Sequence, residues 1–122
     1  NDYTLLIFYA PTCDHCQKEV PEIDSTASVI ERIMQVKIGR FAVCNEPGVP
    51  KRTWTDFISR YKLTKNAIHV DLPANSPIRS TYDAFANPTF YLINRKAEVV
   101  IKKISALTLR KYFASLQKNP KP

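Results

Sequence analysis

Apolar residues along the chain fall into two patterns, continuous runs and recurrences at helical spacing. Residues 3–9 form a nearly continuous apolar run, which is typical of a strand buried in the centre of a parallel or mixed sheet. The next apolar positions recur at helical spacing and are Val20, Ile23, Ala27, Ile30 and Met34. They predict a long amphipathic helix from about residue 13 to residue 35, bent at Pro21.

The same two patterns predict the remaining elements. In chain order these are a strand at 41–44, a helix around 54–61, a short strand at 67–70, a helix that Ser76-Pro77 opens and that ends before Pro88, strands at 89–93 and 98–103 paired as a hairpin, a last helix around 109–116, and a frayed tail at 118–122. A strand–helix–strand unit followed by a hairpin and a helix is an α/β layered arrangement. We therefore expect a single α/β domain over residues 1–122.

Composition and charge narrow the function classes. A chain of 122 residues, 44% of them hydrophobic, can bury the core of one domain. The net charge is +7, but the basic residues are scattered and no base-reading motif accompanies them, so we expect no nucleic-acid partner. With only two glycines, the chain offers no glycine-rich phosphate loop. Because it begins at Asn1 rather than Met, we expect it to be a piece of a longer protein.

The strongest chemical signal is Cys13-Asp14-His15-Cys16, which follows the first predicted strand and opens the first predicted helix. Two cysteines at this spacing lie about one helical turn apart and can close a disulfide. The free N–H groups and the positive dipole end of the helix stabilise a thiolate on the first of them. Since the thiolate is the attacking species in thiol–disulfide exchange, we predict that Cys13 is the nucleophile and that Cys16 resolves the mixed disulfide.

Other uses of these cysteines are a permanent disulfide, a zinc half-site or a copper site. A zinc site needs a second pair of ligands at fixed spacing, and only Cys44, His15 and His69 remain. A copper-binding protein or metallochaperone would combine Cys13 and Cys16 with a distal histidine, which only His69 could supply. We expect redox chemistry without a metal or cofactor and keep copper binding as the alternative. Cys44 is expected to be a small buried hydrophobe.

Two prolines extend the cysteine pattern. Pro21 stands five residues after Cys16, and Pro88 opens the apolar strand at 89–93. With these features, nearly the whole chain resembles the thioredoxin superfamily, and within it the TlpA/ResA-type extracytoplasmic branch. The resemblance implies a thioredoxin fold, in which a central mixed β-sheet is flanked by helices. It also implies a cis peptide bond before Pro88 at the active site, and an inserted helical segment at roughly 46–72, between the second strand and this proline.

The resemblance further implies an activity and a setting. The activity is that of a thiol–disulfide oxidoreductase, a reductase or isomerase whose direction depends on its partner and compartment. The partners implied are protein thiols and disulfides and an upstream redox protein. The location implied is outside the cytoplasm, periplasmic or membrane-anchored, with any membrane tether lying outside residues 1–122.

Thr12 and Ile7 depart from that family, and the departure at Ile7 affects proton transfer. Thr12 stands where most of its members have tryptophan, and Ile7 stands where thioredoxin has a buried aspartate. Proton transfer to or from Cys16 therefore needs another group. Glu46 matches the glutamate that reaches the active site in ResA-type proteins, and it is the candidate general acid or base.

The residues between the cysteines tune the redox balance. His15 can add positive charge or a hydrogen bond near the Cys13 thiolate, and stabilising the thiolate makes the disulfide more oxidising. Asp14 opposes this effect because a carboxylate repels a neighbouring thiolate. His15 is therefore a candidate site residue that favours an oxidising pair.

Overall fold

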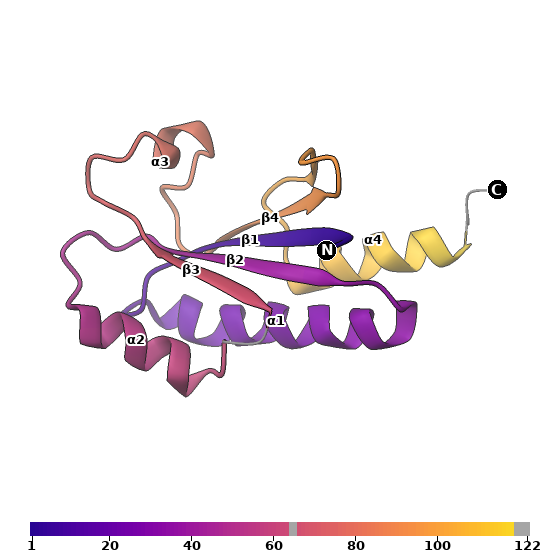
Figure 1. Ribbon diagram of the computed structural model, residues 1–122, viewed down its shortest axis with the longest axis horizontal. Coiled ribbons are helices and arrows are strands. Elements are labelled where there is room, and N and C mark those ends of the chain that lie inside the picture. The colour runs from indigo at the N-terminus through magenta and orange to yellow at the C-terminus, as the bar shows by residue number, and fades with distance from the viewer. Residues whose placement is uncertain (64–65, 119–122) are drawn as a thin grey trace.

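The protein is described by a computed structural model that covers residues 1–63 and 66–118 (Figure 1). These residues form a five-stranded sheet with the strand order β3-β2-β1-β4-β5. The strands are β1 (Tyr3–Tyr9), β2 (Ile38–Cys44), β3 (Ala67–Asp71), β4 (Thr89–Asn94) and β5 (Val99–Ile101). The helices are α1 (Asp14–Met34), α2 (Lys51–Arg60), α3 (Ile78–Thr81) and α4 (Ala106–Lys118).

The central strand β1 sets the direction of its neighbours. It runs parallel to β2 and antiparallel to β4, so the sheet is mixed, as predicted. Tyr9, the last residue of β1, lies opposite Cys44, the last residue of β2. Phe8 lies opposite Thr89, the first residue of β4. Three chain segments far apart in sequence therefore meet at one edge of the sheet.

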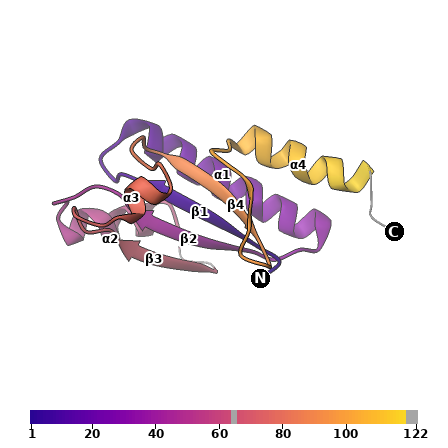
Figure 2. The ribbon, with the colours of Figure 1, turned by 90° about the horizontal axis from the view of Figure 1, so that it is seen from above.

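Helices cover the two faces of the sheet unequally. In Figures 1 and 2, α1 and α4 lie along one face and the single turn α3 lies on the other. The larger apolar core is on the α1 face; members are Leu5, Ile7, Val20, Ile23, Phe57 and Phe113. The smaller cluster is on the α3 face; members are Leu6, Phe8, Val43, Tyr82 and Tyr91. This alternation along β1 explains its continuous apolar run, because both faces of a central strand are buried.

The second strand begins earlier than the predicted 41–44. It starts at Ile38 and includes Arg40, which is only 6% exposed. The Arg40 guanidinium donates to Asp24 at 2.8 Å and to Glu31 at 2.5 Å, both on α1. In the sequence, a charged residue at this position suggests that the strand does not include it. In the structure, two carboxylates from α1, which packs on the sheet, compensate for the burial of Arg40.

Two other elements are shorter than predicted, for a shared reason. The helix expected to run from Ser76-Pro77 almost to Pro88 is the single turn α3. It ends at Thr81. Two residues later the φ of Asp83 is 50°, and the N–H groups of Asp83 and Ala84 donate to Ser80 O at 3.1 Å and Arg79 O at 2.8 Å. These two bonds form a Schellman motif, which closes a helix. Similarly, β5 ends before Lys103, whose φ is also 50°.

The other predicted elements agree with the structure to within a few residues. The helix α1 is helical on both sides of Pro21, and the helices predicted around 54–61 and 109–116 correspond to α2 and α4. Of the expected tail, Lys118 is the last residue of α4, and 119–122 lie outside the described residues. Across residues 1–63 and 66–118, no helix has both the length and the apolar character needed to span a bilayer.

Candidate active site

The first cysteine, Cys13, lies between the end of the central strand β1 and the start of the long helix α1. After β1, a turn brings the N–H of Cys13 to within 3.0 Å of Ala10 O. Cys13 is the N-cap of α1, with an extended backbone, and its carbonyl accepts the first helical bond from Gln17 N at 3.1 Å. Cys13 therefore lies at the N-terminal end of α1, where the helix dipole is positive.

The two cysteines have different surroundings. Cys13 is half-buried, whereas Cys16 is 0% exposed. Burial raises the pKa of the Cys16 thiol to about 12; the Ala10 N–H, which donates to its Sγ at 3.4 Å, lowers it in part, and the Cys13 sulfur raises it further. Cys16 is therefore a protonated thiol at neutral pH, and it must lose a proton before it can attack.

The segment before β4 completes the surroundings of Cys13. The Asn87–Pro88 peptide bond is cis, as predicted. The Cys13 thiol donates from Sγ to Asn87 O at 3.8 Å, although the two residues lie 74 positions apart in the chain. The pairing of β1 with β4 explains this meeting, since Thr89 lies opposite Phe8 near the end of β1.

Glu46 reaches the site from the segment after β2. Its Oε1 accepts from Thr12 N at 3.1 Å and its Oε2 accepts from Thr12 Oγ1 at 2.8 Å. The carboxylate is half-buried. The Glu46 carboxylate thus binds both the backbone N–H and the hydroxyl group of Thr12, the residue directly before the nucleophile.

His15 lies on the outer side of α1. Its side chain is 83% exposed, and its Nδ1 lies 4.0 Å from Glu19 Oε2, one helical turn further on. In the part of the chain that the structure describes, no hydrogen bond joins His15 to Cys13. The site residues named from the sequence therefore divide into two groups. Cys13 lies beside Cys16 and Asn87, and Glu46 contacts Thr12, the residue before Cys13. The His15 side chain instead lies near Glu19.

A buried polar group that the sequence analysis did not single out lies beneath the cysteines. Tyr9 is 0% exposed and stacks on Phe57 with ring centroids 4.7 Å apart. No bond to its Oη has good hydrogen-bond geometry among the described residues. Burial raises the pKa of Tyr9 well above the usual range, and the nearby Trp54 side chain lowers it in part. Cys44, its sheet partner, is also 0% exposed, and burial raises the pKa of this thiol to about 12. Cys44 is therefore a buried thiol, as predicted.

Asn45 and Arg79 are two further polar residues near the site that were not predicted from the sequence. Asn45 directly follows β2, is 5% exposed, and donates from its backbone N to Tyr9 O at 2.6 Å. Its side chain bonds to Arg79 and to the segment before Pro88. The available signal was a polar residue immediately after a buried strand, at the edge where the cysteines lie.

The candidate metal ligands do not gather at the cysteines. His69, the distal histidine considered for copper, lies on β3, where its Nε2 contacts Leu63 O. Within residues 1–63 and 66–118, no three histidine, cysteine, aspartate or glutamate side chains lie close enough together to hold a metal ion. Among the described residues, no group of ligands therefore favours the copper alternative.

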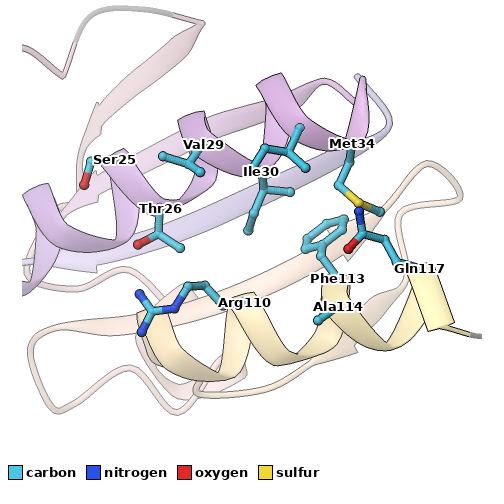
Figure 3. A pocket seen from close by; sticks show the side chains of 10 residues that line it. Ser25, Thr26, Val29, Ile30, Met34, Arg110, Phe113, Ala114 and Gln117 are labelled. Carbon is cyan, nitrogen blue, oxygen red and sulfur yellow. The ribbon is translucent and has the colours of Figure 1, made fainter.

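A separate hollow lies between α1 and α4 (Figure 3). It has a volume of about 290 Å³, and its lining includes Val29, Ile30 and Met34 of α1. Ile30 and Met34 point toward Phe113 of α4. Its lining comes from the later turns of α1, not from the first turn that carries the cysteines. The hollow is therefore distinct from the candidate active site.

No protein-family model matches this sequence, and no curated protein matches it. Solved structures do resemble the fold. A domain of a possible thiol-disulfide isomerase from Cytophaga hutchinsonii matches with a TM-score of 0.77 and 23% identity, over 96% of this chain and 76% of that one. A thioredoxin-like protein from Parabacteroides distasonis matches with a TM-score of 0.72 and 18% identity, over 92% of this chain and 79% of that one.

A third similar structure is that of a secreted disulfide oxidoreductase from Mycobacterium tuberculosis. It matches with a TM-score of 0.68 and 18% identity, over 94% of this chain and 82% of that one. The structural neighbours are thus thioredoxin-like proteins and thiol–disulfide oxidoreductases, and their match extends over nearly the whole chain. The mixed five-stranded sheet flanked by helices, together with these neighbours, shows that this chain has the thioredoxin fold.

Proposed function

We propose that this domain is a TlpA/ResA-type thiol–disulfide oxidoreductase that exchanges disulfides with protein substrates through Cys13 and Cys16. The observation that carries the proposal is the asymmetry of the two thiols. Cys13 is half-buried at the N-terminus of α1, with its Sγ 3.8 Å from Asn87 O, while Cys16 is fully buried one turn behind it. A reachable sulfur in a site that favours a thiolate suits attack, and a protected second sulfur suits resolution.

The reaction then has two exchange steps. In the first, the Cys13 thiolate attacks one sulfur of a substrate disulfide; a Cys13–substrate disulfide forms, and the other substrate sulfur leaves as a thiolate. In the second, Cys16 loses its proton and attacks the Cys13 sulfur, which forms the Cys13–Cys16 disulfide and releases the second substrate thiolate. Two electrons pass from the dithiol to the substrate, and an upstream dithiol protein restores the reduced pair.

Protein substrates suit the surface beside Cys13. The carbonyl of Asn87 lies at the sulfur, and an extended peptide that approaches Cys13 can hydrogen-bond to this backbone. Pro88 follows it without an N–H group of its own. Phe85, two residues before Asn87, is 66% exposed and offers an apolar contact for side chains next to the substrate cysteine. We assign Asn87, Pro88 and Phe85 to substrate binding.

Two further residues have supporting roles in this proposal. Glu46 holds Thr12 beside the nucleophile, and it is also the candidate acid or base for the proton of Cys16. His15 is exposed next to the pair and meets the approaching substrate or redox partner. Neither residue donates or accepts electrons in the exchange. They affect its rate and its equilibrium between the dithiol and the disulfide.

We also propose that residues 1–122 form one domain of a longer protein that works outside the cytoplasm, as a reductase or an isomerase. The secreted disulfide oxidoreductase among the structural neighbours supports this location. Disulfide substrates support it too, because they persist in oxidising compartments.

Serine substitutions test the proposal. Cys13→Ser should abolish reduction of the insulin disulfides, whereas Cys16→Ser should still attack and should accumulate a mixed disulfide that is visible on a non-reducing gel. Cys44→Ala is the matched control, since that thiol is buried away from the proposed chemistry, and it should keep wild-type turnover. Wild-type turnover by Cys13→Ser, or loss of activity only in Cys44→Ala, would refute the assignment.

A further inference from the structure

The amide of Asn45 connects β2 to the segment that contacts the nucleophile. Its Nδ2 donates to Ala84 O at 2.7 Å and to Asn87 Oδ1 at 3.0 Å. Ala84 is 0% exposed and Asn45 is 5% exposed, so the bond between them is removed from water, while Asn87 is partly buried. One buried side chain therefore holds the segment on both sides of Phe85, up to the residue whose carbonyl meets the Cys13 sulfur.

Arg79 holds the other end of the same amide. Its Nε donates to Asn45 Oδ1 at 2.5 Å. The rest of the guanidinium donates to the backbone carbonyls of Pro73, Ala74 and Leu72, at 2.9, 3.2 and 3.5 Å. The Arg79 side chain therefore ties Asn45 to the segment that follows β3.

The hydrogen bonds form a closed circuit. Arg79 donates to Asn45, Asn45 donates to Ala84 O, and Ala84 N donates back to Arg79 O at 2.8 Å through the motif that ends α3. The chemistry of the partners fixes the orientation of the amide, because the guanidinium can only donate and the Ala84 carbonyl can only accept. An aspartate at position 45 would lose both Nδ2 bonds, and an aliphatic residue would lose all three.

We infer that Asn45 and Arg79 are positioning residues, which hold the Asn87 carbonyl at the Cys13 sulfur and thereby set the affinity for protein disulfides. This inference rests on the proposed function. A peptide that binds alongside Asn87 gains most when that backbone is fixed before it arrives, because the substrate then does not have to order the segment. A small disulfide without a peptide backbone needs only the Cys13 sulfur and gains nothing from the circuit.

A comparable arrangement at the far end of the sheet supplies a control. Asn94 also organises a turn with its side chain, since its Oδ1 accepts from Lys96 N at 2.9 Å and from Glu98 N at 3.0 Å. It lies opposite Tyr3, at the end of β1 remote from the cysteines. Asn94→Ala removes a similar set of turn bonds away from the site.

The test measures kcat and KM for insulin reduction, and the second-order rate constant for reduction of bis(2-hydroxyethyl) disulfide. For Asn45→Ala we expect the insulin KM to rise about tenfold, with kcat and the small-disulfide rate within twofold of wild type. Asn94→Ala should leave all three values within twofold. An unchanged insulin KM in Asn45→Ala would overturn the inference, as would an equal loss toward both disulfides, which indicates general damage to the fold.

A second variant keeps the test decisive if Asn45→Ala does not fold. Arg79→Lys retains the charge but loses the planar guanidinium, and it should raise the insulin KM about threefold without changing the small-disulfide rate. Arg95→Lys is its control, because Arg95 pairs with Asp2 on the exposed surface. An insulin KM unchanged by Arg79→Lys would overturn the inference alone, whereas a wild-type protein that reduces neither disulfide would overturn the proposed function with it.

Discussion

The rim and the floor of the candidate site are built in opposite ways. The rim consists of Thr12, Cys13, Glu46, Phe85 and Asn87, which are at least partly exposed. Its polar groups are joined to one another, by the two bonds from Thr12 to Glu46 and the contact from Cys13 to Asn87. A substrate therefore meets a surface whose donors and acceptors are already arranged.

The floor consists of Tyr9, Cys16 and Cys44, each 0% exposed. Burial raises the pKa of all three side chains, because an apolar interior disfavours their charged forms. This difference in burial between rim and floor explains how two thiols of one motif can have different roles. Cys13 is partly exposed on the rim, where a substrate can reach its sulfur, while burial in the floor keeps the Cys16 thiol protonated at neutral pH.

The largest expected effect concerns the floor. The pKa values of Cys16 and Cys44 rise from 9.0 to about 12 on folding, so between these pH values the folded protein retains protons that the unfolded chain loses. Below pH 9 these two thiols should contribute no pH dependence to the free energy of unfolding. As the pH rises from 9 toward 12, the free energy of unfolding should fall. The slope approaches about 1.4 kcal/mol per pH unit for each thiol.

Urea unfolding of the reduced protein from pH 8 to pH 11 measures this loss. Cys44→Ala removes one of the two thiols, so its stability should fall less steeply than that of the wild type over the same range. Parallel stability curves for the two proteins would show that the floor does not hold the proton on Cys44.

A smaller effect is expected on the rim at Glu46. Glu46→Gln replaces the carboxylate, whose two oxygens accept hydrogen bonds from Thr12, with a neutral amide. Hydrogen bonds to a charged group contribute about 1.5–3 kcal/mol to stability. Partial exposure reduces that contribution, so we expect about a fivefold slower attack by Cys13. Stopped-flow measurement of mixed-disulfide formation in the Cys16→Ser background isolates this step.

The same variant separates the two roles proposed for Glu46. A slower first step indicates that Glu46 acts through Thr12 on the nucleophile. An unchanged first step with slower closure of the Cys13–Cys16 disulfide, measured with Cys16 intact, indicates proton transfer at Cys16 instead. Thr12→Val, which removes only the hydroxyl bond, should reproduce part of the first effect and none of the second.

The smallest expected effect lies at Phe85, on the outer part of the rim. Phe85→Ser removes an aromatic ring that is 66% exposed, so the free energy of unfolding should change by less than about 0.5 kcal/mol. The insulin KM should rise about threefold, because an apolar contact for the substrate is lost. Val99→Ser is a control at an exposed apolar residue of β5, and a matching rise in its KM would contradict a specific role for Phe85.

Sequence patterns could predict those parts of the fold that depend on local periodicity. The bounds of β1 agree residue for residue, and α1 agrees to within one residue at each end, because a buried strand and an amphipathic helix each have a characteristic spacing of apolar residues. The sequence also predicted that chemistry takes place at one edge of the sheet. This prediction came from the spacing of Cys13 and Cys16 and from the position of Pro88.

Contacts between distant segments could not be predicted in this way. Arg40 extends β2 because Asp24 and Glu31 neutralise it from α1, and nothing in the local pattern around Arg40 indicates that pairing. Asn45 and Arg79 meet only because β2 ends beside the segment after α3. Positions of this kind depend on the folded arrangement, and two of them, Asn45 and Arg79, are the ones inferred to hold Asn87 beside Cys13.

The most direct test of the account is an equilibrium redox titration of the whole chain in glutathione buffers, followed by mass spectrometry of trapped thiols. We predict a single two-electron transition in which Cys13 and Cys16 form one disulfide, while Cys44 remains a thiol throughout. A disulfide that includes Cys44, or the absence of any disulfide between Cys13 and Cys16, would contradict it.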